Sequence, residues 1–183
     1  MSDKRMFRTR RQGSRNVIAV TLYCILILVL VAADQLAKLW AVNSLSKLGS
    51  VPVVGNIIKF TYAENTGAAF SMLEGKRILL ILFPAVLTVV SLIILFSRRF
   101  KSVPLDISLA LISAGGIGNL IDRIRQGYVI DFIDFNIIHF AIFNIADTCV
   151  SIGVALLIMF LLIHEGNFGG RKSKGGIFTG RRF

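Results

Sequence analysis

Four long apolar segments dominate this sequence and limit what it can fold into. They cover residues 17–33, 78–96, 105–121 and 145–163. Each is close to the roughly 20 residues that a helix needs to cross the hydrocarbon layer of a bilayer. The composition agrees, because 55% of the residues are hydrophobic, 17% are charged and the mean hydropathy is +0.73. These features exclude an ordinary soluble domain and predict an all-α polytopic membrane protein with four transmembrane helices.

The 183 residues leave room for one membrane domain, which we place at residues 17–163. Basic tails flank it at 1–16 and 164–183, and the Gly, Ser, Arg and Lys content of residues 1–15 and 167–183 predicts disorder. The first apolar segment is longer than the apolar part of a typical signal peptide, and three more spans follow it. We therefore interpret it as a span that is not cleaved.

The positions of the basic residues indicate the orientation of the chain. Of the 21 Lys and Arg residues, 14 precede span one, separate spans two and three, or follow span four. Because such residues are retained on the cytoplasmic side during insertion, both termini are predicted in the cytoplasm and the loops 34–77 and 122–144 outside. The charge of +11 is split among these segments, which argues against a nucleic-acid-binding face.

The first outer loop, at about residues 41–77, contains two runs typical of β-strands. Residues 51–54 and 57–62 are separated by Gly55-Asn56, which is a turn signal. The sequence therefore predicts a small sheet on the outer membrane face. Trp40 and Tyr62 suit the membrane interface.

Ionisable residues within or beside the spans gather at their outer ends. Such groups are costly in a membrane and usually face the protein interior or a wet cavity. Asp34 and Lys38 are four positions apart, so they share a helical face and can pair, either as a structural salt bridge or in a functional role. The other charged candidates are Asp122, Arg123, Asp131, Asp134 and Asp147.

Among the ionisable residues near the ends of the spans, the carboxylates are the groups that could carry out catalysis. His139 is interpreted as an interfacial side chain, His164 lies at the opposite end of span four, and no zinc-binding spacing is present. Cys24 and Cys149 lie in apolar runs and suggest neither a disulfide nor a metal site. Two carboxyl groups in a low-dielectric pocket share a proton, so that one activates water while the other polarises a carbonyl. This chemistry is aspartic-type peptide hydrolysis.

The spacing alone does not decide which two acids form the pair. Asp147 opens span four one turn after Asn144, although a first-turn acid also complements a helix dipole. Asp122 adjoins Arg123 and is expected to be ionised in a structural ion pair. Asp131 has apolar neighbours, so desolvation should raise its pKa, and Asp134 is a spare candidate. Asn119 is a polar amide within a span and needs a partner.

Together these motifs resemble one family, the bacterial lipoprotein signal peptidases, also called signal peptidase II. Five blocks in order carry the resemblance: Ala33-Asp-Gln-Leu-Ala-Lys38, Asn65-Thr-Gly-Ala-Ala-Phe70, Gly115-Gly-Ile-Gly-Asn-Leu-Ile-Asp-Arg123, Val129-Ile-Asp-Phe132 and Phe143-Asn-Ile-Ala-Asp147. Any one block would be weak evidence, but five in the same order are specific.

The resemblance implies an aspartic endopeptidase of the bacterial inner membrane, with four helices, a small extracytoplasmic β-cradle and an active site near the outer face. It implies cleavage of prolipoproteins just before a diacylglyceryl-modified cysteine, with membrane lipids and these precursors as partners. No metal or cofactor is expected, and we expect a monomer. By position, Asp131 and Asp147 match the catalytic aspartates, and the supporting or substrate-binding residues are Asp34, Lys38, Asn65, Asn119, Asp122, Arg123 and Asn144.

Two other classes of function are compatible with acids at the ends of spans. A small ion-coupled carrier could use them to bind protons or cations, although no inverted repeat is visible. A noncatalytic membrane scaffold would leave the acids dispensable. A lipidated precursor peptide separates these classes, because only a peptidase would cut it.

Overall fold

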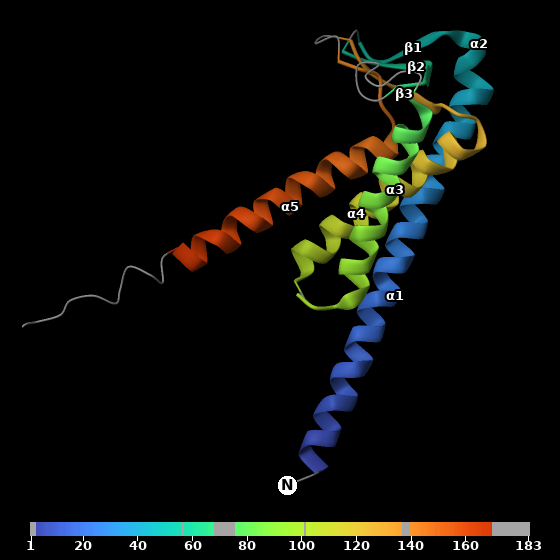
Figure 1. The fold of residues 1–183 in the computed structure, drawn as a ribbon. Helices are drawn as coiled ribbons and strands as arrows, with labels where there is room; N and C mark the ends of the chain where they lie inside the picture. The colour runs from blue at the N-terminus through green and yellow to red at the C-terminus, as the bar shows by residue number, and fades with distance from the viewer. Residues whose placement is uncertain (1–2, 56, 68–75, 101, 137–139, 170–183) are drawn as a thin grey trace, which may run out of the picture.

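The computed structural model describes residues 3–55, 57–67, 76–100, 102–136 and 140–169, and Figure 1 shows their arrangement. Among these residues, four helical stretches are long and apolar enough to cross a membrane. They are Asn16–Leu48, Arg77–Ser97, Val103–Arg125 and Ile145–Ile163. The predicted fold class, four spans with a small sheet, is confirmed.

The first helix, α1, is longer at both ends than the sequence predicted. It covers Asp3–Trp40, so most of the tail that we expected to be disordered is helical. Lys, Arg, Met and Gln are good helix formers, and extending an existing helix avoids the cost of nucleation. Beyond Trp40 follow a π-helical turn, Ala41–Leu45, and the short helix α2, Ser46–Leu48. Asp34 and Lys38 therefore lie well inside helical structure.

Helix α4, Val103–Arg125, is the central helix of the bundle. In its most apolar stretch 61% of the residues are buried, against 6–22% in the other three spans. It packs against α1, against α3, Arg77–Ser97, and against α5, Ile145–Gly169. A Cβ atom at Gly115 would lie 2.2 Å from the Ala146 carbonyl oxygen, so this glycine allows α5 to begin directly against α4. Figure 1 shows α5 diverging from α3, whereas it stays packed against α4, since a Cβ atom at Gly153 would lie 2.9 Å from the Ser108 carbonyl oxygen.

A three-stranded antiparallel sheet lies at the end of the bundle where α1 finishes and α5 begins (Figure 1). Strands β1, Ser50–Val54, and β2, Ile58–Asn65, form the predicted hairpin. Strand β3, Val129–Phe135, was not predicted, and it comes from the second outer loop. It pairs with β2 so that Asp131 is opposite Ala63. The third strand therefore carries an acid from one outer loop onto a sheet built by the other.

An apolar cluster fixes the sheet on the end of α1. Its buried members are Ala41 and Leu45 below, and Ile130 and Phe132 on β3. Trp40 packs edge-on against Phe60 with ring centroids 5.4 Å apart. Because side chains alternate along a strand, Asp131 projects from the face opposite to Ile130 and Phe132.

Candidate active site

A buried ion cluster joins the C-terminal parts of α1 and α4. The Lys38 ammonium lies 2.9 Å from an Asp34 carboxylate oxygen and 2.8 Å from an Asp122 carboxylate oxygen. The exposed fractions of Asp34, Lys38 and Asp122 are 1%, 2% and 4%. The predicted Asp34–Lys38 pair is therefore present, but it is a buried three-residue cluster that holds two spans together.

Two amides extend this cluster. Lys38 Nζ donates its third hydrogen bond to Asn119 Oδ1 at 3.0 Å. Gln35 Nε2 lies 3.2 Å from Asp34 Oδ2 and 3.1 Å from Asp122 Oδ1, so it bridges the two carboxylates. All three ammonium protons of Lys38 thus have acceptors, and Asn119 is held with its oxygen towards the lysine.

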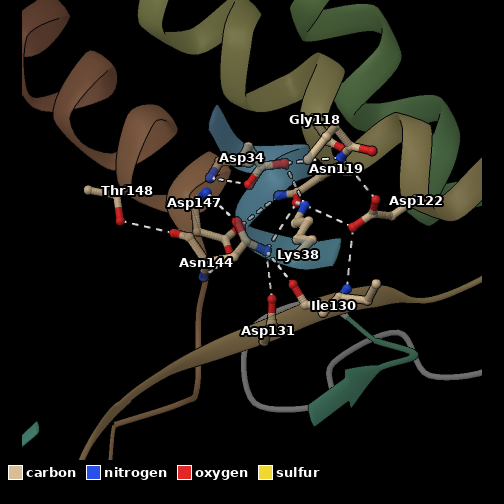
Figure 2. Close-up of polar contacts among 12 residues, drawn as sticks. Asp34, Lys38, Gly118, Asn119, Asp122, Ile130, Asp131, Asn144, Asp147 and Thr148 are labelled. Carbon is tan, nitrogen blue, oxygen red and sulfur yellow. Dashed lines mark hydrogen bonds and ion pairs between the residues drawn. The ribbon is translucent and has the colours of Figure 1, made fainter. Parts of the chain in front are cut away.

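Asp131 and Asp147 are brought together at one asparagine. Asn144 Nδ2 donates to Asp131 Oδ1 at 2.6 Å, and the Asn144 backbone N–H donates to Asp147 Oδ2 at 3.2 Å. Asn65 donates to Asp131 Oδ2 at 2.9 Å, and Asn119 donates to Asp147 Oδ1 at 2.7 Å. Figure 2 shows Asp131, Asn144 and Asp147 lying together beside Lys38. Each of the four carboxylate oxygens therefore accepts a hydrogen bond from an N–H group.

The start of α5 positions two of these groups through a reciprocal cap. Asn144 Oδ1 accepts from the Asp147 backbone N–H at 2.9 Å, while Asp147 Oδ2 accepts from the Asn144 backbone N–H. This arrangement is a capping box, in which the side chains three residues apart satisfy each other's free backbone donors. The first-turn role that the sequence offered for Asp147 is therefore present, alongside its contact with Asn119.

Burial changes the acidity of Asp131, which is 1% exposed. Its pKa is raised to about 7, first because burial penalises the charged form and second because the negative Asp147 lies nearby. Hydrogen bonds from Asn65 and Asn144 and the positive charge of Lys38 oppose this shift without cancelling it. The apolar neighbours of Asp131 in the sequence predicted the direction of the shift.

A cavity of about 670 Å³ lies beside the pair. Most of its wall is apolar and comes from α3, α4, α5 and the segment before α5. Its polar lining includes Asn65, Asn119, Arg123 and Asp147. Asp147 thus borders the cavity directly, while Asp131 is joined to it through Asn65. The cavity can therefore hold a mainly apolar molecule next to Asp147.

One expectation about a charged neighbour is corrected. Asp122 pairs with Lys38 instead of its sequence neighbour Arg123, because adjacent helical residues do not face each other. Arg123 Nη2 instead donates to the Gly67 carbonyl at 2.9 Å, beside the cavity. Asp134 accepts from Thr61 at 3.2 Å and is paired in register with Lys59 on β2. His139 lies outside the described residues.

Gln35 is the supporting residue that the sequence reasoning missed. It lies inside the first block of the resemblance, between the two residues singled out there, but a lone glutamine on a helix carries no chemical signal of its own. Among the described residues, no group of three or more His, Cys, Asp or Glu side chains could hold a metal ion. Cys24 and Cys149 are free thiols.

Comparison with known proteins places the chain in a family. The profile described as Signal peptidase (SPase) II matches residues 26–163. The lipoprotein signal peptidase of Clostridioides difficile (strain 630) is 38% identical over 144 residues, which are 79% of this chain and 97% of that protein. That of Clostridium tetani (strain Massachusetts / E88) is 43% identical over 146 residues, or 78% of this chain and 94% of that one.

Solved structures agree with the sequence relatives. A bacterial membrane enzyme determined by the in meso method at 2.3 Å resolution has a TM-score of 0.76 and 28% identity, covering 87% of this chain and 96% of that chain. A second, determined at 1.9 Å, has a TM-score of 0.65 and 34% identity, covering 78% and 94%. The matched residues include all five motifs and both acids of the pair, and the chain belongs to the signal peptidase II family.

Proposed function

We propose that this chain is an intramembrane aspartic endopeptidase that removes signal peptides from diacylglyceryl-modified prolipoproteins, with Asp131 and Asp147 as its catalytic residues. Family membership establishes a signal peptidase and excludes the carrier and scaffold alternatives. The observation that carries the residue assignment is that the two acids, from β3 and α5, share Asn144 beside an apolar cavity.

This geometry supports hydrolysis by one water molecule. The ionised carboxylate removes a proton from water, whose oxygen attacks the scissile carbonyl carbon, while the protonated carboxyl gives its proton to the carbonyl oxygen. When the resulting diol breaks down, the first acid returns its proton to the leaving nitrogen and the second recovers one from a hydroxyl. The products are the carboxyl terminus of the signal peptide and the free amine of the lipoprotein.

The cavity supports a lipid-bearing substrate. Its walls include Phe83 and Leu87 of α3 and Val150 and Ile152 of α5. Burial of an acyl chain contributes about 0.8 kcal/mol per methylene, which would hold the peptide at the depth of the acids. We infer that the lipid and the signal helix enter between these spans, and that cleavage occurs just before the modified cysteine.

The other polar residues have three different roles. Asn65, Asn119 and Asn144 touch the acids directly and orient them. Asp34, Lys38 and Asp122 hold α1 against α4, while Arg123 borders the cavity where the substrate backbone would lie. Variants of the amides should therefore impair catalysis, variants of the ion cluster should lower stability, and variants of Arg123 should weaken substrate binding.

We infer that the enzyme is a monomer in the bacterial inner membrane, with both termini in the cytoplasm and the active site near the outer face. The distribution of Lys and Arg supports this orientation, since 14 of the 21 flank the predicted cytoplasmic ends of the spans. The sheet and the acids then lie together at the outer side, where the exported precursor arrives.

The decisive experiment incubates the purified protein in lipid vesicles with a lipidated precursor and its unlipidated form, followed by gel mobility. We expect cleavage of the lipidated precursor alone. Asp131→Asn and Asp147→Asn should each abolish cleavage, while Asp134→Asn, on the same strand as Asp131, should retain it. Cleavage by both pair variants, or equal cleavage of the two precursors, would contradict the proposal.

A further inference from the structure

The two acids have different hydrogen-bond donors, and Asp147 has those that favour a negative charge. Asp147 lies in the first turn of the 25-residue helix α5, where the helix dipole stabilises anions. One of its oxygens accepts the Asn144 backbone N–H at 3.2 Å, and the other accepts the Asn119 amide at 2.7 Å. Both donors are fixed by structure outside the pair.

Lys38 determines which end of the Asn119 amide faces Asp147. The lysine has no acceptor atom, so it can bond only to the amide oxygen, at 3.0 Å. Asn144 Nδ2 also points to that oxygen, at 3.2 Å. The NH₂ group of Asn119 must therefore face Asp147, and the positive charge behind the amide strengthens it as a donor. A cation on α1 thereby stabilises the carboxylate on α5.

Asp131 lacks comparable support. It lies on a strand, away from any helix N-terminus, and its donors are the neutral amides of Asn65 and Asn144. Asn144 Nδ2 is also within bonding distance of Asn119 Oδ1 and the Ile130 carbonyl, so two hydrogens are divided among three acceptors. Among the described residues neither acid forms an ion pair.

The charged groups around the pair do not remove this difference. From α1 come Asp34 and Lys38, and from α4 come Asp122 and Arg123. Lys38 is already paired with both aspartates, and Arg123 donates to the Gly67 carbonyl. From α5, the thiol of Cys149 interacts with Asp34. The raised pKa of Asp131, about 7, is consistent with the contacts.

We propose that the single proton of the pair is carried by Asp131, that Asp147 is the ionised member, and that Lys38 is a positioning residue that keeps Asp147 ionised through Asn119. The roles in the reaction rest on the proposed function. Asp147 is then the base that takes a proton from water. Asp131 is the acid that protonates the carbonyl oxygen.

The location of the proton can be measured without turnover, so its failure is distinguishable from failure of the proposed function. Infrared spectra of the protein in vesicles at pH 6 should contain a protonated-carboxyl band that fades with a midpoint near pH 7. The band should be absent from Asp131→Asn and retained by Asp147→Asn, with Asp134→Asn as the matched control that leaves it unchanged. A band that persists in Asp131→Asn, or that is lost in Asp147→Asn, would overturn the assignment.

The role of Lys38 is tested by the pH profile of kcat/KM with a lipidated precursor. Lys38→Met should move the acid limb of the profile to higher pH by about one unit or more, because Asp147 then needs a higher pH to ionise. Lys38→Arg, which keeps the charge, should restore the limb. Gln35→Leu removes the hydrogen bonds to Asp34 and Asp122 from the same cluster without removing a charge, and it should leave the limb in place.

A second variant protects this test if Lys38→Met does not fold. Asn119→Leu breaks the link to Asp147 while leaving the ion pairs of Lys38 intact, and it should move the acid limb in the same direction. A uniform fall in rate at every pH, with the limb unmoved in both Lys38→Met and Asn119→Leu, would show a purely structural role and overturn the proposal.

Discussion

The protein contains two buried groups of acids that are separated by a single amide, Asn119, yet their surroundings differ. Asp34 and Asp122 share the ammonium of Lys38 at 2.9 and 2.8 Å. Asp131 and Asp147 are held by amide and backbone N–H donors alone. Buried carboxylates neutralised by a cation are stable but chemically inert, whereas carboxylates without one keep a proton that can be transferred.

This difference separates structure from chemistry within one polar core. The ion cluster lies between two spans, α1 and α4, and fixes their packing, while its one link to the pair runs from Lys38 through Asn119. The acid pair lies between a strand and the start of α5, and Asp147 lines a mainly apolar cavity. Variants of the first group should therefore change mainly stability, with Lys38 also setting the pH dependence of catalysis, and variants of the second group should change mainly catalysis.

Outside the acid pair itself, the largest effect on catalysis is expected at Asn144, the residue that both acids of the pair contact. Asn144→Ala should lower kcat/KM by about 100-fold or more, because small displacements of catalytic groups have effects of that size. Its loss as the cap of α5 should cost only about 1 kcal/mol of stability. Kinetics with a lipidated precursor and thermal unfolding in the same detergent measure both. A loss of stability without a comparable loss of rate would place Asn144 with the structural group.

The opposite pattern is expected for the ion cluster. Lys38→Met leaves Asp34 and Asp122 buried without their cation, which should cost about 3–5 kcal/mol of unfolding free energy. Thermal unfolding in detergent measures this loss. The combined variant Asp34→Asn, Lys38→Met, Asp122→Asn removes all three charges and should lose much less. If the combined variant were as unstable as Lys38→Met alone, the cost would come from packing and not from an unpaired charge.

The acid pair should also make stability depend on pH. The folded-state pKa of Asp131, about 7, is above its ordinary value of 3.8, so the folded protein binds this proton more tightly than the unfolded chain. The contribution is fully present below pH 3.8 and is lost as the pH rises through about 7, amounting to about 4 kcal/mol. Unfolding temperatures of the wild type and Asp131→Asn between pH 4 and pH 8 should therefore differ in slope. Parallel curves would contradict the raised pKa.

The sequence predicted the spans, the hairpin and the candidate acids because each leaves a local signal. Apolar length marks the helices, Gly55-Asn56 marks the turn, and an acid next to an apolar span is conspicuous. The family resemblance then chose Asp131 and Asp147 from a set that spacing had left open. The third strand, Val129–Phe135, was not predicted, because its pairing partner β2 comes from the other loop.

Contacts between residues far apart in the sequence were the second feature that the sequence could not predict. The sequence placed Asp122 with Arg123 because the two are adjacent, whereas the helix turns them apart and Lys38 of α1 reaches Asp122. Gln35 left no signal because its amide matters only once α1 and α4 are packed. The chemistry of each acid is thus decided by contacts that cross between elements, which local sequence does not encode.

Gln35 and Asn65 offer the sharpest test of the comparison, because each is an amide that donates to a buried carboxylate. Gln35 bridges Asp34 and Asp122, and Asn65 donates to Asp131. Gln35→Leu removes hydrogen bonds to charged groups and should cost about 1.5–3 kcal/mol of stability, with kcat/KM changed by less than about threefold. Asn65→Leu removes a bond to an acid that carries the proton, so it should cost about 1 kcal/mol and lower kcat/KM by about tenfold or more. Thermal unfolding and cleavage, measured in one detergent, give the loss of stability and the loss of kcat/KM for each variant. If both variants lost mainly stability, or both lost mainly kcat/KM, the division between a structural cluster and a reactive pair would fail.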